Sequence, residues 1–142
     1  MMKSEKTALI VVDVQGKLAQ LMYGKQALFE NLRKIIQGIQ ALGIPILWAE
    51  QKPEGLGPTI PEVAELLTGI APIGKSSFSC CRSERFLQAL KAVNRAQLLI
   101  AGIEAHVCVY QTAMDLVDLG YEVEVVTDAV SSLVSTGLNY RP

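Results

Sequence analysis

The stretch from Leu98 to Val109 constrains the fold most, because it passes from one kind of secondary structure to another across a single glycine. An aliphatic run ends at Gly102, and an amphipathic pattern begins near His106 and continues to Gly120. This pattern predicts a buried strand, a tight turn and then a helix.

The same alternation recurs along the chain. Thr7–Val14 is an almost continuous aliphatic run rich in β-branched residues, as is typical of a strand covered on both faces of a parallel sheet. Further strands are expected at 45–49, 70–73, 98–101 and 121–127, and helices at 26–42, 61–67, 83–93 and 106–120. We expect an α/β fold: a doubly wound, Rossmann-like parallel sheet of about five strands, with helices on both faces in three layers.

Some segments break this alternation. Prolines and glycines between Lys52 and Pro61 exclude regular structure there, so we expect a loop that could flank a pocket. Glu122 and Glu124 alternate with valines, which places the last strand near the sheet edge. Beyond Asp128 we expect no more than a turn of helix.

Composition restricts the classes of function. The chain has 142 residues, half of them hydrophobic, so we expect a single domain over 1–142. Thirteen basic against fourteen acidic residues, with no basic stripe, argue against a nucleic-acid partner. No apolar stretch is long enough to span a membrane and no signal peptide is evident, so a cytoplasmic protein without a membrane partner is expected.

Metal, disulfide and nucleotide sites lack their usual signals. Three cysteines, with Cys80 and Cys81 adjacent, do not form a disulfide framework. One histidine leaves little from which to build a transition-metal site. No glycine-rich phosphate loop follows any expected strand. We therefore predict neither a metal nor another cofactor.

Asp13, Lys75 and Cys108 each stand at or just past the end of an expected strand. Each also has an ordinary interpretation: Asp13 as a turn or capping residue, Lys75 as a solvated surface charge and Cys108 as a buried thiol. Because the carboxyl ends of parallel strands share one edge of the sheet, we expect the three side chains to converge there.

The chemistry of this set is that of nucleophilic hydrolysis. Lys75 and a helix start at Cys108 would lower the pKa of the thiol, and Asp13 could accept its proton and return it to a leaving group. His106 is a poor base for Cys108, because side chains two residues apart around a helix start do not face each other.

With these residues in place, the chain resembles the isochorismatase-like cysteine hydrolases, the group that includes nicotinamidases. The matching segments are ALIVVDVQ with Asp13, GKSSFS with Lys75 and AGIEAHVCV with Cys108. The resemblance implies that Asp13, Lys75 and Cys108 form a catalytic triad. It also implies a cis peptide bond between Ile103 and Glu104, and an oxyanion hole from the backbone N–H groups of Glu104 and Cys108.

The second expected strand distinguishes branches of this family. Nicotinamidase-like members hold a metal with an Asp and histidines after that strand, whereas this chain has Glu50-Gln51-Lys52 and no histidine there. We therefore expect no metal and do not expect nicotinamide as the substrate. The segment EQKPEGLGPT is more similar to the isochorismatase-domain-containing or YcaC-like branch. Gln15, Gln51 and Phe78 are candidates to line a pocket for a small-molecule substrate.

The end of the chain also differs from the family. Its members continue past the fifth strand with another helix and a sixth strand, which the residues up to Pro142 cannot supply. We therefore expect a shortened member, or a homo-oligomer in which a partner covers the edge of the fifth strand, rather than an active monomer.

Three functions are consistent with these features. The first is a cysteine-dependent hydrolase of small-molecule amides, esters or related groups. The second is a catalytically impaired member that serves as a binding or oligomerisation module. The third is vinyl ether hydrolysis of the isochorismate type, which need not use the cysteine.

Overall fold

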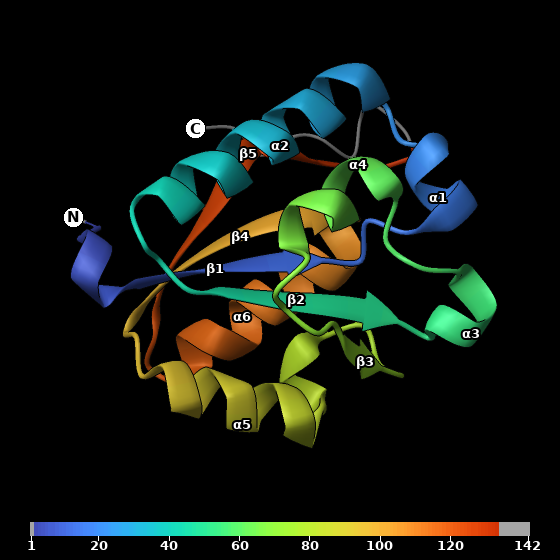
Figure 1. Ribbon diagram of the computed structural model, residues 1–142. Coiled ribbons are helices and arrows are strands. Elements are labelled where there is room, and N and C mark those ends of the chain that lie inside the picture. The colour runs from blue at the N-terminus through green and yellow to red at the C-terminus, as the bar shows by residue number, and fades with distance from the viewer. Residues whose placement is uncertain (1, 134–142) are drawn as a thin grey trace.

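A parallel five-stranded sheet organises the protein, with the strand order β3-β2-β1-β4-β5 (Figure 1). The computed structural model describes residues 2–133. The strands are β1 (Thr7–Val12), β2 (Ile46–Gln51), β3 (Ile73–Lys75), β4 (Gln97–Ile103) and β5 (Glu122–Ser131). The order reverses at β1, which lies between β2 and β4, so this is the predicted doubly wound sheet.

Helices cover both faces of the sheet, as predicted (Figure 1). They are α1 (Gly16–Gln20), α2 (Lys25–Ala41), α3 (Pro53–Leu56), α4 (Pro61–Ala64), α5 (Glu84–Val93) and α6 (Tyr110–Asp118). Single turns of 3-10 helix span Ser4–Lys6, Glu65–Leu67 and Cys80–Arg82, and Ala105–Val109 forms a π-helical segment between β4 and α6.

Two apolar clusters fill the space between these layers. On one face, α2 packs Leu28, Leu32 and Ile36 against Leu9 and Val11 of β1. On the other face, α5 and α6 contribute Phe86, Leu90 and Leu116, which pack against the alternate residues Ala8, Ile10 and Val12. Because every residue of β1 is buried, its aliphatic run has the composition of a strand covered on both faces.

Glycine is required at position 102, where β4 passes closest to β1. Gly102 pairs with Val12 and has a φ of 131°, which side chains rarely adopt. A Cβ atom at this position would overlap the Val12 backbone. The turn predicted from Gly102 therefore lies two residues further on, after Ile103, and Gly102 instead permits close contact between the two central strands.

Several predicted boundaries need correction. β1 ends at Val12 and not at Val14, since Asp13 has a φ of 55° and leaves the strand. The third strand was expected at 70–73 but begins at Ile73 and ends on Lys75, paired with the last residues of β2. The expected loop after β2 contains one helical turn, α3, which begins with Pro53 at a position where proline is tolerated.

The last strand is longer than the sequence pattern predicts. β5 does lie at the sheet edge, as expected, but it continues past Asp128 to Ser131 instead of ending at 127. A register shift near Gly102 lets the pairing resume between Gly102 and Val130. The rest of the tail, residues 134–142, lies outside the described residues, and so does the predicted turn of helix there.

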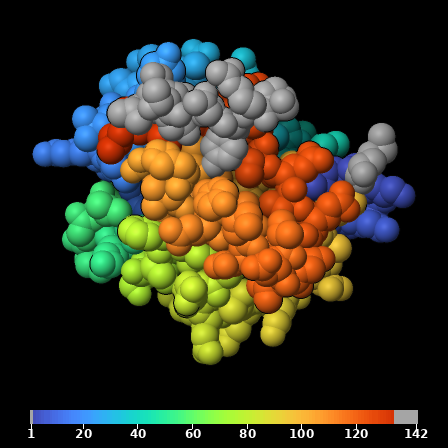
Figure 2. Space-filling model, turned by 180° about the vertical axis from the view of Figure 1, so that it is seen from behind, coloured from blue at the N-terminus to red at the C-terminus, as the bar shows by residue number. Residues whose placement is uncertain are grey.

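The back of the molecule exposes one face of α6 (Figure 2). Tyr110, Met114 and Val117 follow each other at helical spacing, and each is about half exposed. Among the described residues, no helix is both long and apolar enough to cross a membrane.

Candidate active site

Four polar side chains meet at the carboxyl edge of the sheet. Asp13 follows β1 directly, Gln51 is the last residue of β2 and Lys75 is the last residue of β3. Cys108 lies in the π-helical segment after β4. The structure therefore brings together all three residues that the sequence placed at strand ends, and adds Gln51.

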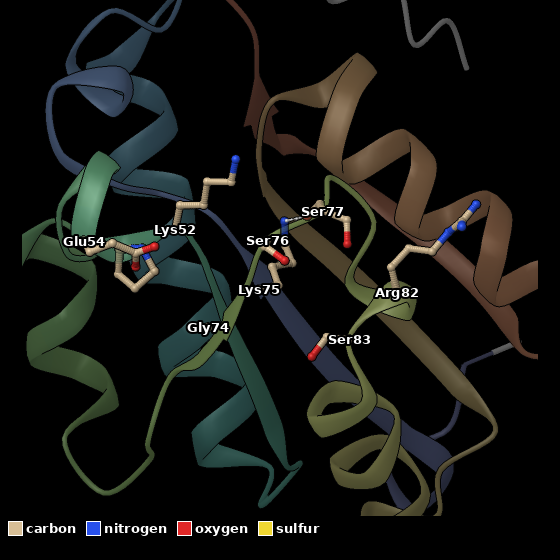
Figure 3. A pocket seen from close by; sticks show the side chains of 9 residues that line it. Lys52, Glu54, Gly74, Lys75, Ser76, Ser77, Arg82 and Ser83 are labelled. Atoms are coloured by element: carbon tan, nitrogen blue, oxygen red, sulfur yellow. Dashed lines mark hydrogen bonds between the residues drawn. The ribbon is translucent and has the colours of Figure 1, made fainter.

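Lys75 is buried at the centre of this group. Its Nζ donates hydrogen bonds to Asp13 Oδ2 and Gln51 Oε1, both at 2.8 Å, and to the carbonyls of Ser77 and Phe78 at 2.9 Å. Figure 3 shows the bond to Ser77 as a dashed line. The side chains of Lys75 and Asp13 are only 1% and 3% exposed. Lys75 is thus not the solvated surface charge that its residue type alone would suggest.

Asp13 forms an ion pair, yet the pKa of its carboxyl group is raised. Burial raises its pKa above the ordinary value, because desolvation outweighs the opposing effects of the Lys75 charge and of the nearby Cys108 thiol. Its Oδ1 atom is buried and has no regular hydrogen bond within residues 2–133. Because Oδ2 is held by Lys75, Oδ1 is the oxygen available to accept a proton from the thiol.

The Cys108 thiol has a pKa well above its ordinary value. Burial is the main cause, and the Asp13 carboxylate raises the pKa further, while Lys75 lowers it only in part. The prediction of an easily ionised thiol is therefore wrong for the unliganded protein. Cys108 is the fourth residue of a π-helical segment, and α6 begins only at Tyr110, so the thiol does not lie at the start of a regular helix.

Gln51 connects the Cys108 thiol to the ion pair. Its Oε1 accepts hydrogen bonds from Lys75 and, at 3.5 Å, from Cys108 Sγ. Gln15 fixes the backbone of Gln51 by accepting from its N–H at 2.6 Å and donating to its carbonyl at 3.0 Å. This corrects one prediction: Gln15 is fully buried and positions Gln51, instead of lining the substrate pocket.

A cavity of about 100 Å³ lies against Asp13 and Cys108. Gln51, Phe78 and Glu104 line it, and that Gln51 and Phe78 contact a substrate stays a prediction. The remaining wall is apolar, formed by Leu18, Leu56, Ile103 and Val107. The peptide bond between Ile103 and Glu104 is cis, so the resemblance led to the correct backbone geometry. The cavity has room for a small group beside the thiol.

Glu50, the neighbour of Gln51, binds the loop after β2 and does not line the cavity. Its Oε2 accepts from the backbone N–H and the hydroxyl of Thr59, at 2.8 and 2.7 Å. Trp48 Nε1 donates to the same hydroxyl. Among the described residues, no group of three or more His, Cys, Asp or Glu side chains could hold a metal ion. The absence of a metal in the working protein remains a prediction.

The lone histidine is held away from the thiol. His106 is exposed, and its Nδ1 lies 2.7 Å from Ser132 Oγ. Cys80, which precedes an expected helix and for which the sequence favours a packing role, is fully buried in the same apolar cluster as Cys108.

Comparison with known proteins agrees with this fold. Residues 7–137 match the isochorismatase domain, and this chain belongs to the isochorismatase family. It is 35% identical over 136 residues to isochorismatase domain-containing protein 2 of Danio rerio. This alignment covers 95% of this chain and 68% of the zebrafish protein. The chain spans only about 60% of the cow, frog and mouse relatives of that type.

Solved structures show the same architecture. The MAR1 ribonuclease of Caenorhabditis elegans is 38% identical, with a TM-score of 0.88 over 96% of this chain and 70% of the nematode chain. YcaC of Escherichia coli, described as an octameric hydrolase of unknown specificity, is 25% identical, with a TM-score of 0.91 over 96% of this chain and 69% of the bacterial chain. The family and fold predicted from the motifs are therefore confirmed.

Proposed function

We propose that this isochorismatase-family chain is a cysteine-dependent hydrolase of small-molecule amides, esters or related groups, with Cys108 as the nucleophile. One observation carries the proposal: Cys108 and Asp13 line one small cavity, and Asp13 has an unbonded Oδ1 while its Oδ2 is held by Lys75. Each partner has a role that matches its surroundings.

The first step joins Cys108 to the carbonyl carbon of the substrate. Cys108 Sγ attacks the carbonyl carbon while Asp13 Oδ1 accepts the thiol proton. Because burial raises the pKa of the Cys108 thiol, its ionisation before the attack is unfavourable, so we place the proton transfer together with the attack, when negative charge moves to the carbonyl oxygen. The raised pKa of Asp13 makes its carboxylate a stronger base for this transfer. We assign the backbone N–H groups of Glu104 and Cys108 to that oxygen, since both residues line the cavity.

The second step restores the thiol. The carbon–nitrogen or carbon–oxygen bond breaks, and Asp13 returns its proton to the leaving group. Asp13 then takes a proton from water as the water attacks the resulting thioester. The carbon–sulfur bond breaks, Asp13 passes this proton to the Cys108 sulfur, and the acid is released. Throughout, Lys75 and Gln51 act as positioning residues, because they hold Oδ2 of Asp13 and orient the thiol.

The test is turnover on a panel of small amides and esters by wild type, Cys108→Ala and Asp13→Asn, with Cys81→Ala as the matched cysteine control. Either site variant should lose about a thousandfold or more, whereas the control should keep its rate. Full turnover by Cys108→Ala would contradict the proposal.

The panel also separates the alternatives. Turnover of a vinyl ether that survives Cys108→Ala but not Asp13→Asn would favour vinyl ether hydrolysis. No turnover by wild type, with an unreactive Cys108, would favour a binding or oligomerisation module. A short RNA is included because a similar nematode protein is described as a ribonuclease. For the present chain, the absence of a nucleic-acid partner remains a prediction.

We also propose a homo-oligomer. Support comes from the exposed stripe Tyr110, Met114 and Val117 and from the octameric YcaC. Analytical ultracentrifugation of wild type and Met114→Lys tests this proposal, and a monomer at all concentrations would contradict it. The predictions that the chain is a single domain without the family's last helix and strand, and that it is cytoplasmic, remain predictions.

A further inference from the structure

A second, larger cavity adjoins the catalytic one. We call it the outer basin: it measures about 600 Å³ and is lined by Gln51, Lys52, Ser76, Ser77, Phe78, Ser79, Arg82 and Gln111. Gln51 and Phe78 line both this basin and the cavity beside Cys108. A molecule with one end at the thiol could therefore extend past these two side chains into the basin.

The lining of the outer basin favours negative charge. It includes two cations, Lys52 and Arg82, together with hydroxyl and amide groups, and no carboxylate. Within residues 2–133, neither cation forms a hydrogen bond or an ion pair through its side chain. In Figure 3 the two lie on opposite sides of Ser76 and Ser77.

Nearby carboxylates do not neutralise this pair. Asp13 is paired with Lys75, and Glu50 is bonded to Thr59. Glu54 lines an adjoining cavity of about 320 Å³ together with Lys52 and Arg82, but within residues 2–133 it forms no ion pair with either cation, and it does not line the basin itself. The anionic group of a ligand would thus contact two cations that have no ion-pair partner within residues 2–133.

We infer that the outer basin binds an anionic group of the substrate through Lys52 and Arg82. The substrate class is then an amide or ester in which a small acyl group is joined to an amine or alcohol that carries a carboxylate or a phosphate. The 100 Å³ cavity receives the acyl group, and the basin receives the charged remainder. This inference rests on the proposed function, because it places the reacting carbon at Cys108.

Two matched alkylating probes test the basin without a known substrate. N-chloroacetylglycine and N-chloroacetylglycinamide carry the same electrophile and differ only in the charge of the distal group. With either probe, Cys108 Sγ forms a bond to carbon as the carbon–chlorine bond breaks, and chloride and a proton are released. Peptide mass spectrometry gives the rate at each cysteine, and half-buried Cys81 serves as the internal reference.

The measured quantity is the rate ratio of the anionic to the neutral probe. In wild type we expect this ratio to be about tenfold higher at Cys108 than at Cys81. Lys52→Gln combined with Arg82→Gln should lower it to the Cys81 value and leave the neutral probe's rate at Cys108 unchanged, which shows an intact site. Lys91→Gln combined with Arg95→Gln removes the same charges from a distant cavity and should change nothing.

The outcomes separate the two proposals. A ratio at Cys108 that does not respond to the Lys52 and Arg82 substitutions overturns the anion site but leaves the nucleophile in place. Reaction of Cys81 alone, with both probes, overturns the proposed function and the anion site with it. Replacing the carboxylate by a phosphate, in the chloroacetyl amide of aminoethyl phosphate, identifies which anion gives the higher ratio, and a raised ratio with either supports the site.

Discussion

At the carboxyl end of the sheet the ion pair between Lys75 and Asp13 is buried, whereas at the amino end the cation Arg95 bonds to the Ser4 carbonyl at the surface. The two ends belong to the same strands and share the same core. The difference follows from the loops: the segment after β3 folds over Lys75 and accepts its hydrogen bonds, while the segment before β4 leaves Arg95 only partly buried. Charge is costly to remove only where it has been desolvated together with its partner.

Replacing Lys75 should give the largest difference in stability between the two ends of the sheet. Lys75→Met should lower the free energy of unfolding by about 3–5 kcal/mol, because the buried Asp13 carboxylate loses its partner. Arg95→Gln, at the exposed end, should cost less than about 0.5 kcal/mol. Urea denaturation followed by the fluorescence of Trp48, the only tryptophan, measures both variants.

A double variant identifies the cause of that loss. Asp13→Asn combined with Lys75→Met removes both buried charges and should recover part of the stability. If Lys75→Met alone were as mild as Arg95→Gln, the ion pair would not be desolvated in solution.

The close approach of β4 and β1, which supports the carboxyl end, gives the next largest effect. Gly102→Ala should cost about 2–4 kcal/mol, because the added Cβ overlaps the Val12 backbone and the φ of 131° disfavours a side chain. Gly43→Ala is the matched control: its φ is also positive, but a Cβ there meets open space. That variant should cost about 1 kcal/mol. Equal losses in thermal and urea unfolding would argue against the close approach.

The remaining effect concerns pH. Burial raises the pKa of Cys80 to about 12, well above the value of an unfolded thiol. Cys80 therefore contributes stability that is fully present below pH 8.5 and is lost as the pH rises toward 12, because only the unfolded thiol ionises in that range. This loss amounts to about 1.4 kcal/mol per pH unit.

Substitution of Cys80 isolates that contribution. In Cys80→Ala, the free energy of unfolding should fall less steeply above pH 9, by up to about 1.4 kcal/mol per pH unit. Urea unfolding midpoints at several pH values measure this change. Leu90→Ala, in the same apolar cluster, should lower stability by the same amount at every pH. An unchanged slope in Cys80→Ala would show that the thiol ionises in the folded protein.

Most of the fold could be predicted because hydrophobic periodicity is a local property of the chain. The β-branched run at Thr7–Val12 and the apolar stripe of α2 give the strand and the helix, and their alternation gives a parallel sheet. The wrongly predicted bounds discussed next belong to β3 and β5, the two edge strands of the sheet. β5 extends to Ser131 because β4 pairs with it, and β3 begins at Ile73 because β2 pairs with it; such partners are invisible in a local pattern.

The sequence by itself determined the family, the order of the strands along the chain and the convergence of Asp13, Lys75 and Cys108, because these depend on residue type and on the shared edge of parallel strands. Only the tertiary structure decided the ionisation of the site. Its burial raises the pKa values of Asp13 and Cys108, and its contacts make Gln51 the acceptor between the thiol and the lysine. Desolvation and hydrogen bonding depend on what surrounds a group in space, which is why the spacing of residues could not reveal them.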